Sequence, residues 1–96
     1  MNAKKEFLVE VKCYGKPICA NICSRTNTCK LKPDYGNKEY DEFLKSLDFD
    51  YDAGYGGQEL FGTILFNDSF SDRHEYDGSE NWDNHRIPTA KQVMED

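Results

Sequence analysis

The alternation of apolar and polar residues near the start of the chain predicts a β-strand. Between residues 7 and 14, apolar side chains alternate with mostly polar ones, and the apolar set is Phe7, Val9, Val11 and Cys13. Alternation with a period of two residues is typical of a strand with one buried face. Gly15, Lys16 and Pro17 then indicate a turn. Residues 18–23 follow as a second strand or a short helix, and residues 29–32 as a further strand of an antiparallel meander.

The spacing of apolar residues changes in the middle of the chain and predicts a helix over residues 38–47. Its apolar positions fall at i, i+3, i+4 and i+7, and they are Tyr40, Phe43, Leu44 and Leu47. This spacing places the four side chains on one face of a helix. Asn37 is the expected N-cap, and the acidic residues of the first turns suit the positive end of the helix dipole.

The second half of the chain predicts a hairpin. Residues 60–66 and 70–76 are strand-like, and the turn-forming residues Asn67, Asp68 and Ser69 join them. Residues 77–88 are polar around Trp82, the only tryptophan, and are expected to form a loop. Residues 89–96 are expected to be a loose tail.

These elements predict a single α+β domain over residues 1–96. Its small antiparallel sheet, made of the amino-terminal meander and the carboxy-terminal hairpin, would pack against the one main helix. Ninety-six residues suffice for one modest core. No apolar run approaches the roughly 18 residues that span a bilayer, and no signal-peptide core follows Met1. We therefore expect the chain to stay in the cytoplasm, without contact to a membrane.

The charge is divided unevenly along the chain. Residues 1–32 contain seven basic and two acidic residues, whereas residues 33–96 contain five basic and 16 acidic ones. The net charges are therefore +5 and −11. An acidic surface repels phosphate backbones and attracts basic grooves, so the pattern argues against direct nucleic-acid binding and favours a basic protein partner. Acidity can also serve solubility alone.

The four cysteines leave three interpretations open. Cys13, Cys19, Cys23 and Cys29 are separated by five, three and five residues, which is not a common zinc spacing. On one strand, Cys19 and Cys23 would lie about 13 Å apart at about 3.3 Å per residue, too far to share an ion, whereas a helix would stack them. Buried free thiols, a metal site and a disulfide are the alternatives, with free thiols favoured.

One acidic segment partly matches the calcium loop of an EF-hand. With Asp48 as the first position, Asp50, Asp52 and Glu59 fall at the third, fifth and twelfth positions, which supply side-chain oxygens. Ala53 stands where the sharp turn requires glycine, and the segment after Glu59 is strand-like. The alternative is a solvated acidic edge that binds no ion.

A second candidate is an acidic and aromatic surface in the carboxy-terminal half. Tryptophan is a favoured interface anchor, and carboxylates around it would attract a basic partner. Trp82 could instead simply close the core. Together with the acidic segment, the predicted partner-binding residues are Asp48, Asp50, Asp52, Asp72, Glu75, Asp77, Glu80, Trp82 and Asp83.

The sequence offers no specific catalytic pattern. His74 and His85 are the only histidines and lie far from every cysteine in the chain, and Gly54 to Gly57 precede a strand rather than the helix of a phosphate-binding loop. We expect a protein that is not an enzyme and that needs no cofactor.

Residues 51–64 and several residues that follow resemble a segment of small phage and prophage accessory proteins of unassigned activity. The resemblance rests on the run from Tyr51 to Ile64, then on Arg73, Glu75 to Glu80, Trp82, His85 and Pro88. Asn81 replaces an aromatic residue expected before Trp82, and the first third of the chain does not share the resemblance.

The resemblance implies a non-enzymatic inhibitor of host defence, such as an anti-CRISPR or antirestriction protein. Such an inhibitor would place an anionic surface in a basic channel meant for nucleic acid. The partner would be a host protein with a basic nucleic-acid-binding surface. The alternative is a small structural or interaction module that binds calcium or zinc.

Overall fold

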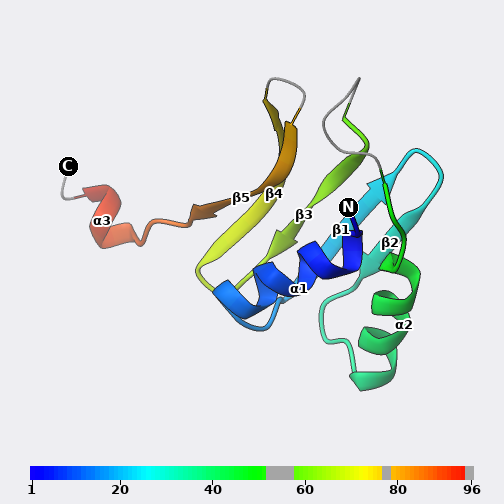
Figure 1. The fold of residues 1–96 in the computed structure, drawn as a ribbon. Helices are drawn as coiled ribbons and strands as arrows, with labels where there is room; N and C mark the ends of the chain where they lie inside the picture. Colours follow the sequence, from blue (N-terminus) through cyan, green and yellow to red (C-terminus); the bar gives the residue numbers. More distant parts are fainter. Residues whose placement is uncertain (52–57, 77–78, 95–96) are drawn as a thin grey trace.

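The computed structural model describes residues 1–51, 58–76 and 79–94. Five strands form one antiparallel sheet in the order β2-β1-β3-β4-β5 (Figure 1). The prediction of an α+β fold with an antiparallel sheet is confirmed. The elements are α1 (Ala3–Tyr14), β1 (Cys19–Ser24), β2 (Thr28–Leu31), α2 (Asn37–Leu47), β3 (Leu60–Leu65), β4 (Ser69–Tyr76), β5 (Ser79–Arg86) and α3 (Ala90–Met94).

The predicted strand over residues 7–14 is wrong, because this segment belongs to helix α1. The Asn2 side chain caps the helix by accepting a hydrogen bond from the Lys5 N–H at 3.0 Å. Phe7 is fully buried, whereas Val9, from the same alternating set, is 57% exposed. No glycine or proline interrupts the segment before Gly15. The Asn2 cap and this absence of helix-breaking residues favour a helix, and the alternating apolar pattern is a coincidence of the sequence.

Helix α2 confirms the predicted helix, with a cap one residue earlier than expected. Gly36 is the N-cap, and its N–H donates to the Glu39 carboxylate at 2.9 Å, while Asn37 is already helical. Phe43 and Leu47 are buried, and Tyr40 and Leu44 are partly buried. The residues at helical spacing therefore do form the inward face of α2.

The segment predicted over residues 18–23 as a strand or a short helix is strand β1, shifted by one residue from the predicted bounds, and the predicted hairpin over residues 60–76 is present. Strand β5 is an addition to the prediction, which placed a loop there. Its sequence is polar because β5 is an edge strand with one exposed face. The short helix α3 has no buried residue and extends away from the sheet (Figure 1).

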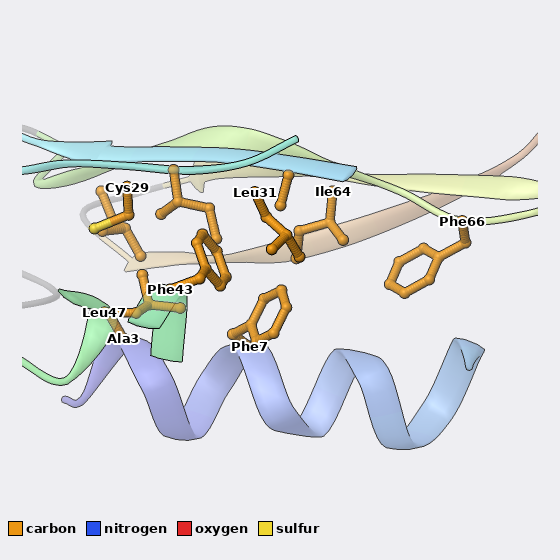
Figure 2. Close-up of a cluster of buried hydrophobic side chains, with 11 residues drawn as sticks. Ala3, Phe7, Cys29, Leu31, Phe43, Leu47, Ile64 and Phe66 are labelled. Carbon is orange, nitrogen blue, oxygen red and sulfur yellow. The ribbon is translucent and has the colours of Figure 1, made fainter. Parts of the chain in front are cut away.

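One face of the sheet carries the core. Buried residues from α1, α2 and the strands meet in a single cluster between α1 and the sheet (Figure 2). Phe7 and Phe43 pack edge to face with ring centroids 5.2 Å apart. The cluster consists of Ala3, Phe7, Ala20, Ile22, Cys29, Leu31, Phe43, Leu47, Leu60, Ile64 and Phe66.

The opposite face of the sheet, here called the open face, is not covered by any element in the described part of the chain. Residues alternate between the two faces along a strand, so the neighbours of the core residues point to the open face. Asn21, Lys30, Phe61, Thr63 and Asp83 are all exposed there. The other open-face residues are Cys19, Cys23, Thr28, Leu65, Phe70, Asp72, His74, Asn81 and His85.

Strands β1 and β3 approach unusually closely at Gly62. Its φ of +145° is a conformation that residues with a side chain rarely adopt. A Cβ atom at this position would lie 2.2 Å from the Asn21 carbonyl oxygen. Glycine is therefore required for the central strand pair to form.

Candidate functional site

The open face has a charge gradient across the strands. The pairing registers align Lys30, Asn21, Thr63, Asp72 and Asp83 in one row from β2 to β5. Directly opposed side chains on neighbouring strands have Cβ atoms about 4.5–5.5 Å apart. The row therefore begins with a positive charge at one edge of the sheet and ends with two negative charges at the other.

The acidic end of this row includes a histidine. Asp72 and Asp83 are directly opposed on β4 and β5, an arrangement that destabilises a sheet because the charges are alike. The His85 Nε2 lies 2.9 Å from the Asp72 Oδ1 and 3.7 Å from the Asp83 Oδ2. The Phe70 ring stacks on the His85 ring with centroids 5.1 Å apart and fixes its orientation.

The second row of the open face is more apolar. Cys19, Leu65, Phe70 and His85 are aligned across β1, β3, β4 and β5. A shallow groove with a largely apolar lining runs over the first three of these residues toward Pro33. Apolar surface next to charged surface is the composition of a binding interface.

The structure separates the predicted partner-binding residues into different places. Asp72 and Asp83 lie on the open face, whereas Glu75, Glu80 and Trp82 point to the helix side of the sheet. Asp48 and Asp50 lie after α2, next to the amino terminus. Asp52 and Asp77 are outside the described residues. The predicted set therefore does not form one continuous surface among the described residues.

Glu80 is buried in an ion-pair cluster centred on Arg73. Its carboxylate accepts a hydrogen bond from the Arg73 Nη2 at 2.7 Å, and also from the backbone N–H groups of Glu59 and Leu60 at 2.7 and 3.0 Å. The side chains of Arg73 and Glu80 are 0% and 2% exposed. These contacts tie β5 to β4 and to the start of β3, so the role of Glu80 is internal.

Helix α1 and Tyr51 complete the Arg73 cluster. The Glu6 carboxylate lies 3.5 Å from the Arg73 Nη1 and accepts a hydrogen bond from the Tyr51 hydroxyl. The Arg73 guanidinium lies over the rings of Tyr51 and Trp82, at 5.6 and 5.2 Å from their centroids. Burial, followed by the hydrogen bond to Glu6, raises the pKa of Tyr51 above its ordinary value of 10.0. The sequence pattern did not identify this cluster, because Glu6 on α1 is remote from Arg73 in the chain.

The described part of the calcium-loop pattern does not converge on one point. The Asn2 side-chain amide donates to Asp48 at 3.2 Å and to Asp50 at 3.0 Å. Glu59 instead pairs with Arg25 at 3.4 Å. Among the described residues, the group whose ligand atoms all lie within 4.8 Å of one another is Asp72, Asp83 and His85.

The cysteines are free thiols in three different surroundings. Cys29 is buried, and its Sγ donates to the Ser46 carbonyl at 3.4 Å. Cys19 and Cys23 are half-buried on the open face of β1, and Cys13 is exposed on α1. Cys19 and Cys23 both lie on strand β1. The sequence analysis predicted that on a strand these two residues are too far apart to share an ion.

Comparisons of the chain with protein-family models, with curated proteins and with solved structures gave no match in any of the three. No helix in the described part of the chain is long and apolar enough to cross a bilayer. The candidate site therefore depends on the geometry of the chain alone, and the resemblance to phage proteins stays a prediction.

Proposed function

We propose that this protein is a non-enzymatic, phage-type inhibitor that binds a basic, nucleic-acid-handling host defence complex. The binding surface is the acidic end of the open face, formed by Asp72, Asp83 and the adjacent Phe70. The observation that carries the proposal is the direct opposition of two half-exposed carboxylates on a sheet face that no described helix covers.

The opposed carboxylates favour a basic partner for a physical reason. Like charges directly opposite each other cost free energy in the free protein, and an arginine or lysine from a partner would relieve that cost on binding. Phe70 supplies apolar area beside the charges, which suits an interface anchor. The −11 net charge of residues 33–96 would add long-range attraction to a basic channel.

The test compares the partner binding of variants in which carboxylates are replaced by amides of the same shape. Asp72→Asn and Asp83→Asn together remove two charges from the open face. Asp41→Asn and Glu42→Gln remove two charges from the exposed side of α2 and serve as the control. Each protein is immobilised, exposed to nuclease-treated bacterial lysate and to purified CRISPR effector complexes, and washed with increasing salt.

We expect the immobilised protein to capture a nucleic-acid-binding complex. Added DNA or RNA should displace this complex, and increasing salt should weaken its binding. The open-face variant should lose this capture, while the α2 variant keeps it. Equal capture by both variants, or capture that nucleic acid does not displace, would contradict the proposal.

A second candidate function is binding of a divalent transition metal at Asp72, Asp83 and His85. The distances of 2.9 and 3.7 Å from the His85 Nε2 to the two carboxylates fit ligands that share an ion at about 2.0–2.2 Å each. Zinc should then raise the melting temperature, and His85→Ala should abolish the effect. His74→Ala is the control, because His74 lies on the same face outside the cluster. The absorption spectrum of bound cobalt should lack a thiolate band. This absence would distinguish binding at Asp72, Asp83 and His85 from binding by the cysteines.

A further inference from the structure

The open face is self-complementary under a two-fold rotation. Strand β3 is third among the five strands, so β2 and β5 lie at equal distances on either side of it, as do β1 and β4. Consider a second copy placed face to face with the first, with the two-fold axis parallel to β3. That rotation sets β2 of each copy opposite β5 of the other, and β1 opposite β4.

The register across the sheet turns this symmetry into a charge match. Lys30, Asn21, Thr63, Asp72 and Asp83 share one row, so the rotation sets Lys30 opposite Asp83 of the second copy and Asn21 opposite Asp72. Thr63 meets its own equivalent at the axis. Symmetry produces the Lys30–Asp83 and Asn21–Asp72 contacts twice each, as in every isologous interface. Antiparallel sheets commonly pack face to face about 10 Å apart, which is close enough for such side chains to meet.

The centre of the face supplies apolar contact for the same arrangement. Phe61 and Leu65 flank Thr63 on β3, and both therefore lie near the axis and meet their own equivalents. Phe61 is 43% exposed in the single chain, which is unusual for so large an apolar side chain. In the apolar row, the rotation sets Cys19 opposite Phe70 of the second copy. The arrangement thus has an apolar centre between charged ends, as interfaces commonly do.

We propose that this protein forms a homodimer through the open face, with the two-fold axis parallel to the strands. The second copy is the occupant that the face specifies, because it carries the reverse charge gradient at the same spacing. Lys30 of one copy relieves the repulsion between the opposed carboxylates of the other. An axis across the strands would instead place β2 opposite β2 and bring Lys30 near its own equivalent.

The dimer goes beyond the proposed function and does not depend on it. It would cover Asp72 and Asp83, so self-association and binding of a basic partner would exclude each other. The following experiment contains no partner, so its failure leaves the proposed function standing, and failure of the proposed function leaves the dimer standing.

The test is sedimentation of charge-reversed variants, with EDTA and reductant present throughout. The unmodified chain should show a monomer–dimer equilibrium that depends on concentration. Lys30→Asp and Asp83→Lys should each weaken the dimer by about tenfold or more, since each places like charges where opposite ones met. Lys38→Asp and Asp41→Lys make the same charge changes on exposed positions of α2 and should leave the dimer unchanged. Circular dichroism verifies that all variants are folded.

The decisive measurement is a mixture of the two weakened variants. When Lys30→Asp protein meets Asp83→Lys protein, both symmetry-related contacts again join opposite charges, so the mixture should recover dimer. A monomer at every concentration would overturn the proposal. So would a dimer indifferent to both reversals, or a mixture without recovery.

Discussion

Glu80 provides the sharpest test of which acidic residues are internal and which belong to the surface. The Glu80→Ala change removes the acceptor of three hydrogen bonds, those from the Arg73 guanidinium and from the N–H groups of Glu59 and Leu60. Breaking a buried ion pair by removing one partner costs about 3–5 kcal/mol. At about 4–8 °C per kcal/mol for a domain of this size, the melting temperature should fall by at least about 12 °C.

The matched comparison is Asp83→Ala on the same strand. Asp83 has a side chain that is 54% exposed, and an exposed substitution should change the free energy of unfolding by less than about 0.5 kcal/mol. Urea unfolding of both variants, followed by circular dichroism, measures the difference. If Glu80→Ala and Asp83→Ala differ by less than about 1 kcal/mol, the buried cluster around Arg73 is refuted. A charge reversal at Glu80 would therefore report unfolding rather than loss of partner binding.

Three further predictions concern stability. Gly62→Ala should cost more than Gly15→Ala in urea unfolding, because both positions have positive φ but only Gly62 lies against a neighbouring strand; equal costs would contradict the close approach. Phe43→Ala should cost about 3–5 kcal/mol and Leu44→Ala less, as Phe43 is the buried one of the pair; a reversed order would show that the helix face is wrong. Because the pKa of Tyr51 is raised in the folded state, its contribution to stability is complete below pH 10.0 and is lost as the pH rises further, so Tyr51→Phe should flatten the alkaline decline of the melting temperature.

The elements with strong local signals were predictable from the sequence. Helix α2 has a complete apolar stripe, and the β3–β4 hairpin has two strand-like runs around a turn. Helix α1 was not predictable from apolar spacing, because Val9 and Cys13 completed an alternating set although both are exposed. The Asn2 cap was the available signal for a helix.

The candidate site was harder to predict than the fold because strand β5 was missed. With residues 79–86 treated as a loop, there was no basis for assigning their side chains to opposite faces of a sheet. The strand period of two places Glu80 and Trp82 beside Arg73, while Asp83 and His85 face outward. The acidic residues were therefore identified by composition, but only their pairing across strands separates internal charges from surface charges.

The pairing of β1 with β3 also constrains how this chain can fold. The β1–β2 and β3–β4–β5 hairpins join neighbouring segments, whereas the β1–β3 pair must close a loop that contains β2, α2 and residues 48–59. Closing a long loop costs entropy before any contact compensates for it, so pairings between remote segments slow folding. Gly62 lies in this pair, where the two backbones come closest. The rate-limiting step of folding should thus be the joining of two locally formed hairpin units, and substitutions along β1 and β3 should slow refolding more than equally destabilising substitutions in α1, which has buried residues but belongs to neither unit.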